Sequence, residues 1–474
     1  MTAPPSPALR KALADLLGDK GYTEDAAAMA PWLVDWRGKY HGAAAAMLSP
    51  ADTAEVAAAV RLCAAAGAAI VPQGGNSGMV GGATPDASGN QLLLSLRRMD
   101  HIRAIDADAE LAIVEAGVIL QNFHDAVLAR GMRFPLTLGG KGSATIGGLV
   151  STNAGGTQVL RHGTMRALVA GVEAVLPDGS VFDGLAPLKK DNRGYDLRHL
   201  FCGAEGTLGI VTAACLRLVP AAAARCTAWI GLASPGDALT LLRRLDTALG
   251  DSLEGFEILP RRALEAVLRH IPQTRDPLAT PSPWYALVEL AGDDPDPLRE
   301  ALEEQLASAH SDALIADAAI AKNDHESEAL WRLRDSISEA ERAEGPALQH
   351  DISVPVEQMP AFIETDPVRL AEQFPGIRTM SFGHLGDGNV HHHVQPPERV
   401  DGTAWLVQHG AAVSRAVYRH VLERGGSISA EHGIGQMKRD ILAELDSPAR
   451  LAALRGVKAG LDPQGIFNPG KLIA

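Results

Sequence analysis

Three histidines close one short stretch of the chain, SFGHLGDGNVHHHV, which runs from Ser381 to Val394. The Asp-Gly dipeptide in its middle favours a two-residue hairpin turn, which would place His384 directly opposite His391. Opposed residues share one face of a sheet with Cβ atoms about 5 Å apart, so both rings could reach one metal ion. Phe382 and His393 would form the next pair on that face. The competing interpretation is a solvated run of histidines that binds nothing.

A later segment, SAEHGIG, offers further ligands. Glu431 and His432 stand side by side there, a carboxylate next to an imidazole. Two histidines and one glutamate around an ion with one open position form a recognised catalytic zinc pattern. His384, His391 and Glu431 are therefore the candidate metal ligands, with zinc as the expected ion and manganese as the alternative.

Glycines are concentrated in two clusters, PQGGNSGMVGG at residues 72–82 and GGKGSATIGGLVSTNAGG at residues 139–156. Successive small residues allow consecutive backbone N–H groups to face one anion, as in phosphate-binding nests. Neither cluster matches the P-loop or the dinucleotide fingerprint of an ordinary nucleotide-binding fold. The alternative is that these glycines only make tight turns.

The two glycine clusters and a third segment, LFCGAEGTLGIVT at residues 200–212, resemble the flavin-binding lobe of the vanillyl-alcohol oxidase and p-cresol methylhydroxylase superfamily. Together with the histidine motifs, the chain is most similar to the FAD-linked D-2-hydroxyacid dehydrogenases, the group of D-2-hydroxyglutarate and D-lactate dehydrogenases. The resemblance extends from Trp36 to the C-terminus.

This resemblance implies an FAD whose dinucleotide is lined by both glycine clusters, with Ile210 near the adenine end. The expected flavin is non-covalent, because Asn76 stands where some relatives have a histidine that attaches it. For Asn468, termination of a helix is an equally good explanation. The residues that the resemblance assigns to the cofactor are Pro72, Gly74, Gly75, Asn76, Ser77, Gly78, Gly142, Ser143, Thr145, Gly148, Ser151, Asn153, Gly155, Ile210 and Asn468.

The resemblance also implies a metal-assisted oxidation of a D-2-hydroxyacid to the 2-oxoacid. His432 matches the family's catalytic base, and an imidazole can accept the hydroxyl proton near neutral pH. Hydride then passes from C2 of the substrate to flavin N5. Asn389 matches a substrate-binding position, although turn formation would explain it as well.

A cation must orient the substrate carboxylate, since a hydroxyacid enters as an anion. The segment LWRLRDSISEAE resembles the family segment that supplies it, which points to Arg334, with Arg332 as the local alternative and Ser338 one helical turn on. Gln349 stands where dicarboxylate-using relatives have lysine, and His393 where they have asparagine. D-2-hydroxyglutarate is the first candidate substrate, and D-lactate or another monocarboxylic D-2-hydroxyacid stays open.

The elements expected around these motifs form an α+β, two-lobed fold of the p-cresol methylhydroxylase type. Strands and helices alternate after Ala224, which indicates an antiparallel sheet with helices on one face. The expected parts are an FAD-binding domain at 1–222, a substrate or cap domain with the metal site at 223–400, and a C-terminal helical segment at 401–474 that returns to the FAD domain.

Composition limits the function classes. The 474 residues carry 43 Lys+Arg against 57 Asp+Glu, a net charge of −14, which disfavours a nucleic-acid partner. Four scattered cysteines and no long apolar run favour a soluble, cytoplasmic protein. Electron-transfer flavoprotein is the expected electron acceptor, and a homodimer the expected assembly. The competing classes are a metal-dependent hydrolase and a nucleotide-binding regulatory module without catalysis.

Overall fold

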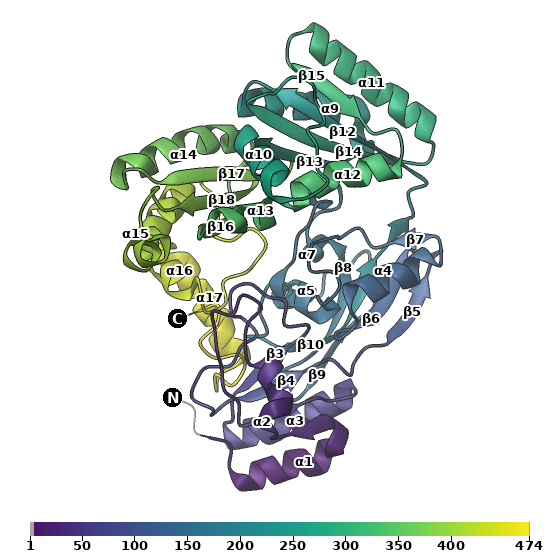
Figure 1. Cartoon of the computed structure of the whole chain (residues 1–474). Helices are drawn as coiled ribbons and strands as arrows, with labels where there is room; N and C mark the ends of the chain where they lie inside the picture. Colours follow the sequence, from purple (N-terminus) through teal and green to yellow (C-terminus); the bar gives the residue numbers. More distant parts are fainter. Residues whose placement is uncertain (1–3, 474) are drawn as a thin grey trace. The chain divides into compact units, whose positions relative to one another are not determined.

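The computed structural model describes residues 4–473, which form two compact units, each with its own hydrophobic core (Figure 1). Unit 1 consists of Met1–Gly156, Gly163–Ala221 and Glu431–Ala474. Unit 2 consists of Thr157–His162 and Ala222–Ala430. The chain therefore enters unit 2 twice, first for the short segment Thr157–His162 and then for Ala222–Ala430, and it returns to unit 1 each time.

Unit 1 contains a four-stranded sheet in the order β1-β2-β4-β3. β4 is parallel to both of its neighbours and is buried along its whole length, as its apolar sequence LLLS requires. The C-terminal segment joins this sheet, because Phe467 forms a parallel bridge with Ile70. The strands are β1 (Tyr22–Thr23), β2 (Ala46–Leu48), β3 (Ile70–Gln73) and β4 (Leu92–Ser95).

A second, five-stranded sheet of unit 1 has the order β5-β6-β10-β8-β9 and is antiparallel throughout. The central strand β10 is buried in seven of its eight positions, in keeping with its nearly uninterrupted apolar sequence. The strands are β5 (Ile102–Asp106), β6 (Leu111–Glu115), β8 (Val169–Val175), β9 (Val181–Gly184) and β10 (Ile210–Arg217), with β7 (Met132–Arg133) and β11 (Val219–Pro220) paired apart from them.

The helices of unit 1 cover these sheets. Helix α3 begins after Asp52, whose side chain accepts from Glu55 N at 2.8 Å, and ends at Gly67 in the left-handed conformation. The helices are α1 (Pro7–Gly21), α2 (Ala26–Met29), α3 (Thr53–Ala66), α4 (Leu120–Leu128), α5 (Ile146–Thr152), α7 (Met165–Leu168), α8 (Arg198–Phe201), α16 (Arg439–Leu445) and α17 (Pro448–Leu461).

Unit 2 is built on one antiparallel sheet of seven strands, in the order β15-β12-β14-β13-β17-β18-β16. The histidine motif forms the hairpin of β17 and β18 near one edge. The strands are β12 (Ala224–Leu232), β13 (Leu253–Pro260), β14 (Trp284–Gly292), β15 (Asp317–Ile320), β16 (Leu348–Ser353), β17 (Arg378–His384) and β18 (Asn389–Gln395).

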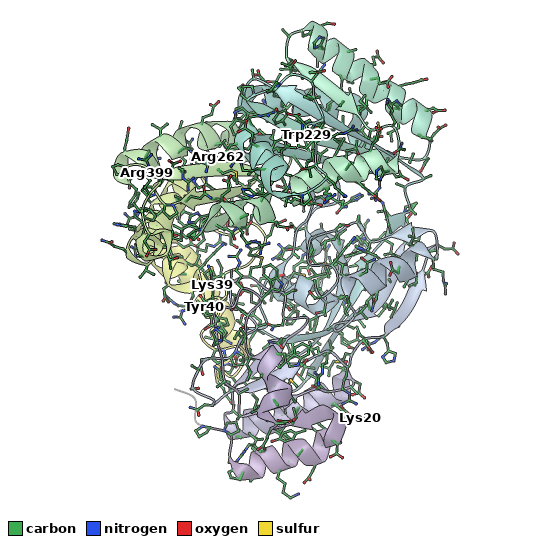
Figure 2. The ribbon with its side chains drawn as sticks, in the orientation of Figure 1. Lys20, Lys39, Tyr40, Trp229, Arg262 and Arg399 are labelled. Carbon is green, nitrogen blue, oxygen red and sulfur yellow. The ribbon has the colours of Figure 1, made fainter. Side chains whose placement is uncertain are left out.

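Helices cover both faces of this sheet, so the expectation of helices on one face was wrong. On one face α10, α12 and α13 pack against alternate residues of the strands, among them the fully buried Trp229, which Figure 2 labels, and Tyr285. The intervening residues, such as Ile230 and Val288, are buried as well, and α9 and α11 contact the same strands. The strands are nearly continuous apolar runs, which is the pattern of a sheet covered on both sides.

The helices of unit 2 include α15, which we expected in the C-terminal segment. The helices are α6 (Val159–His162), α9 (Pro235–Leu249), α10 (Arg261–His270), α11 (Pro295–Ser311), α12 (Asp324–Asp335), α13 (Ile337–Glu344), α14 (Met359–Gln373) and α15 (Gly402–Glu423). Among residues 4–473, no helix has the length and apolar character that crossing a membrane requires.

Candidate active site

The two glycine clusters lie against each other inside unit 1. A Cβ added to Gly74 would come 2.2 Å from Thr145 Oγ1, and one added to Gly75 would come 1.7 Å from Ser143 O. Larger side chains are therefore excluded at both positions. The sequence predicted that both clusters serve one ligand, and the contact between them is the geometry that such a role needs.

The first cluster exposes backbone donors that the protein does not use. Gly74 to Gly78 follow directly after β3, and their N–H groups donate to no other residue in the described part of the chain. Asn76 takes the left-handed conformation, with φ 52°, and its amide nitrogen donates to Val34 O at 2.8 Å. A left-handed residue within a run of free N–H groups is the construction of an anion-binding nest.

The second cluster contributes one unsatisfied hydroxyl. Thr145 precedes α5 and is buried, and its Oγ1 has no hydrogen-bond partner among residues 4–473. A Cβ built at Gly142 meets no atom within 4 Å. An orphaned buried hydroxyl beside free N–H groups fits a phosphate-bearing cofactor, because each group needs an acceptor or donor that the described residues do not supply.

Other residues assigned to the cofactor make contacts within the protein. Asn153 ends α5, and its Oδ1 accepts from Thr164 Oγ1 at 3.0 Å and from Arg166 N at 2.9 Å. Ser151 O accepts from Glu205 N at 2.8 Å. Ile210 begins β10 and belongs to the hydrophobic core. The assigned residues not yet placed are Pro72 within β3, Gly148 in the first turn of α5 and Gly155 after it.

Asn468 connects loops of unit 1 rather than ending a helix, since α17 stops at Leu461. Its Nδ2 donates to Gly82 O at 2.9 Å and to Glu205 O at 2.6 Å. Its Oδ1 is buried and has no partner within residues 4–473. The helix-termination alternative is therefore wrong, and the side chain holds the first glycine cluster.

The histidine hairpin of unit 2 has a different register from the predicted one. His384 pairs with Asn389, and Phe382 pairs with His391, so the pairing is shifted by two residues. The loop has four residues, because Gly388 N donates to His384 O at 3.1 Å. Gly388 has φ 79°, a conformation that favours glycine. A shift of two residues keeps every side chain on its face. The rings of His384 and His391 therefore still meet, as diagonal neighbours with centroids 5.5 Å apart.

Glu257 holds the first of these histidines and was not identified from the sequence. It lies on β13 directly opposite His384, and its Oε1 accepts from His384 Nδ1. Its Oε2 accepts from Arg334 Nε at 2.8 Å. Burial would raise the pKa of Glu257, but the charges of Arg334 and His384 and their hydrogen bonds outweigh it and hold that pKa far below its ordinary value. A carboxylate on Nδ1 leaves Nε2 of the ring for a metal ion.

His391 is suited to be the second ligand. Burial lowers its pKa well below the ordinary value for histidine, and the neighbouring Arg334 and His384 lower it further. The ring is therefore neutral at pH 7 and keeps a lone pair that can bind a cation. Its neighbour in the pairing with β16 is Asp351, a buried carboxylate.

Asn389 is held mainly by the sheet. Its Nδ2 donates to Asp351 Oδ1 at 3.0 Å and to Ile352 O at 2.9 Å. Its own backbone N–H donates to Asp387 Oδ1 at 2.9 Å, as the expected turn chemistry requires. Only Oδ1, which is buried without a partner in the described chain, is left for a ligand.

Of the two candidate arginines, Arg334 faces the histidines. Its NH2 lies 3.4 Å from His384 Nε2, and its guanidinium stacks over Phe382. Arg332 is exposed and donates to Pro272 O at 3.1 Å, away from this cluster. Ser338 is exposed. It does not lie one turn further along the helix of Arg334, because α12 ends before Ser336 and Ser338 belongs to the next helix, α13.

His393 has a buried acidic partner on α13. Glu341 is 1% exposed, and one of its carboxylate oxygens contacts His393 Nδ1. This contact fixes the proton on Nδ1, so that Nε2 is the nitrogen that can face a ligand. Gln349 pairs with His393 across β16 and β18 and is half-buried.

The segment that carries Glu431 and His432 begins where unit 2 ends, at Ala430. Unit 2 holds the preceding residues, because Ser427 exchanges backbone hydrogen bonds of 2.8 and 3.0 Å with Ser353 at the end of β16. Glu431 is four residues further on, at most about 14 Å along an extended chain. In unit 1, Glu205 accepts hydrogen bonds from the loop that follows His432.

Two family models match the chain: an FAD binding domain over residues 44–184 and the C-terminal domain of FAD linked oxidases over residues 221–472. The mitochondrial D-2-hydroxyglutarate dehydrogenase of Arabidopsis thaliana is 36% identical over 459 residues, which cover 97% of this chain and 80% of that protein. A putative D-lactate dehydrogenase of Schizosaccharomyces pombe is 31% identical over 452 residues, 93% of this chain and 84% of that one.

Solved structures with the same fold are more distant in sequence. p-Cresol methylhydroxylase superposes with a TM-score of 0.71 at 16% identity, over 98% of this chain and 96% of that one. The 4-ethylphenol oxidase of Gulosibacter chungangensis gives 0.70 at 19% identity, with the same coverage. These likenesses confirm the fold predicted from the glycine clusters.

Proposed function

The chain belongs to the FAD-linked oxidases, in the group that contains the D-2-hydroxyglutarate dehydrogenases, and from this we propose that it oxidises a D-2-hydroxyacid, with D-2-hydroxyglutarate as the first candidate. The observation that carries the proposal is the cluster that Arg334 of α12 forms with His384 and His391, which share one face of the sheet. It combines a fixed cation for a carboxylate with two ring nitrogens for a metal ion.

Both family models name FAD, and a bound FAD would accept the electron pair that the substrate loses. We assign its binding to the first glycine cluster, where the N–H groups of Gly74 to Gly78 are free, and to Thr145, whose hydroxyl is unsatisfied. Asn76 has no nucleophilic ring nitrogen, so the proposed flavin is held without a covalent bond.

For the divalent metal we propose His384, His391 and Glu431 as ligands. The first two fit on their own chemistry, since each presents a ring nitrogen on the same sheet face and Glu257 orients one of them. Glu431 supports the assignment through its short tether to Ser427 beside β16. Zinc is favoured by two imidazoles and one carboxylate, and manganese is the alternative.

The roles of the remaining residues follow from their chemistry. Arg334 binds the substrate carboxylate and orients it, because a guanidinium recognises a carboxylate through two parallel hydrogen bonds. His432 accepts the proton of the substrate hydroxyl as the C2–H bond breaks. Ser338 and Asn389 are weaker candidates for substrate contact, the first because it is exposed and the second because its amide nitrogen is used by the sheet.

The far end of the substrate is assigned to Gln349 and His393. Glu341 holds His393 from behind, so Nε2 of this ring and the amide of Gln349 offer a second polar group two hydrogen-bonding partners. A substrate with a distal carboxylate fits if the His393 ring is charged. With a monocarboxylic acid such as D-lactate, the His393 ring and the Gln349 amide would form hydrogen bonds with water instead.

We further propose electron-transfer flavoprotein as the electron acceptor, a homodimeric assembly and a cytoplasmic location. Several similar proteins are named as mitochondrial.

A substrate panel tests the proposal. The purified, metal-loaded protein is mixed anaerobically with D- and L-2-hydroxyacids without any electron acceptor, and bleaching of the flavin absorbance near 450 nm is followed. We expect reduction by D-2-hydroxyglutarate and no reduction by its L-enantiomer. Faster flavin reduction by D-lactate would make D-lactate the preferred candidate substrate. A colourless protein that takes up no FAD would overturn the proposed FAD-dependent oxidation.

A further inference from the structure

Glu205 is a buried acid of unit 1 to which no function has been given. Only 8% of the residue is exposed, and its backbone is left-handed, with φ 50°. Its N–H donates to Ser151 O in the second glycine cluster, and its carbonyl accepts from Asn468 Nδ2. The peptide groups on both sides of the Glu205 Cα are thus held by hydrogen bonds, independently of its side chain.

Both oxygens of the Glu205 carboxylate are used by one loop. Oε1 accepts from Ile434 N and Oε2 accepts from Gly435 N, each at 2.7 Å. Ile434 is two residues after His432, so the carboxylate binds the backbone of the segment that follows the proposed base. Burial raises the pKa of the Glu205 carboxyl, and the hydrogen bonds from Ile434 and Gly435 oppose that rise.

The loop after His432 has no room for side chains at Gly433 and Gly435. Gly433 has φ 80°, and a Cβ there would lie 2.8 Å from Glu205 Oε1. Gly435 has φ 53°, and a Cβ there would lie 2.2 Å from Val80 O of the first glycine cluster. Gln436 also donates from its backbone to Val80 O, at 3.0 Å. The loop after His432 is therefore closed between Glu205 and the first glycine cluster.

We propose that Glu205 is a positioning residue that sets the orientation of His432 and ties it to the flavin-binding loops. It does not touch substrate or flavin in this scheme. It acts through the backbone of Ile434 and Gly435, so a ligand that orders the glycine clusters also orders the base. This inference rests on the proposed function, because it assumes that His432 is the base.

The test compares Glu205→Gln with Glu110→Gln. Glutamine has the same size but one acceptor oxygen, so one of the two N–H groups loses its partner. Glu110 is the matched control, since it is also left-handed, with φ 55°, but exposed. A displacement of a catalytic group by about 1 Å can cost 10²-fold in rate. We expect Glu205→Gln to slow flavin reduction about 30- to 100-fold with little change in KM, and Glu110→Gln to match the parent protein.

A double substitution separates positioning from general damage. In the His432→Asn background, where there is no base to orient, Glu205→Gln should slow flavin reduction less than threefold. An equal loss in both backgrounds, or full activity of Glu205→Gln once it is reconstituted with FAD, would overturn the inference. If Glu205→Gln does not fold, Glu205→Asp replaces it with the same two expectations. If His432→Asn alone is fully active, the proposed base is wrong, which is a different failure.

Discussion

Replacement of Glu257 by glutamine should weaken metal binding, although Glu257 is not itself one of the proposed metal ligands. The carboxylate is 1% exposed and serves two partners, Arg334 at 2.8 Å and His384 Nδ1. Glutamine has the same shape, but its single carbonyl oxygen can accept from only one of them. Either Arg334 loses its counter-charge or His384 loses the acceptor that fixes its proton on Nδ1.

The size of the effect follows from that choice. A buried charge left without its partner costs about 3–5 kcal/mol, and the oxygen that glutamine retains reduces this cost to about 2 kcal/mol. For a unit of about 200 residues, such a loss lowers Tm by about 4–8 °C. Loss of the group that orients a metal-ligating histidine reduces metal affinity about 10- to 100-fold.

The assay titrates zinc into the metal-free protein and follows both Tm and the rate of flavin reduction. Glu289→Gln is the control, because Glu289 is a buried acid of the same sheet that accepts from Trp331 Nε1 at 2.6 Å and lies 3.6 Å from Arg225 NH1. Both variants should lose stability, and only Glu257→Gln should need more zinc. Equal zinc requirements in the two variants would refute the orienting role of Glu257.

Four further results are expected. Chelation should stop turnover while the yellow flavin stays bound, since the proposed metal ligands lie outside the glycine clusters; FAD loss on chelation would argue against separate sites. Arg334→Ala should raise KM and lower kcat by about tenfold or more, whereas Arg332→Ala, at an exposed position, should leave both unchanged. Gln349→Lys should lower the KM for D-2-hydroxyglutarate about tenfold, through a charge-assisted bond of about 1.5–3 kcal/mol, and not the KM for D-lactate. Burial would raise the pKa of Asp366, but its contacts with His392 and His420 outweigh burial and lower that pKa to about 2. The ionised carboxylate therefore stabilises the fold by about 2 kcal/mol above pH 4, and this stabilisation is lost as the pH falls towards 2. Asp366→Asn should therefore reduce the free energy of unfolding at pH 7 and flatten its decline in acid, as urea titrations at several pH values can measure.

The parts of the site that could be predicted are those that depend on local sequence. The glycine clusters could be found because a close approach between loops excludes side chains, and Gly75 against Ser143 O is such an approach. The face shared by His384 and His391 could be found because residues alternate along a strand. The register could not, since it depended on whether Gly388 closes a two-residue or a four-residue loop, and both are compatible with Asp-Gly.

The residues that were missed have one property in common. Glu205, Glu257 and Glu341 are buried carboxylates, each more than 40 residues away in sequence from the histidine or loop that it holds. Their neighbours in the chain do not reveal their partners, because the partners are brought close by the pairing of β13 with β17, by the packing of α13 on the sheet and by the return of the C-terminal segment to unit 1. A buried acid is costly unless it is paired, so such residues can be recognised once the strand order is known. A search for acids in otherwise apolar strand positions, such as Glu257 in GFEIL, is the signal that the sequence does contain.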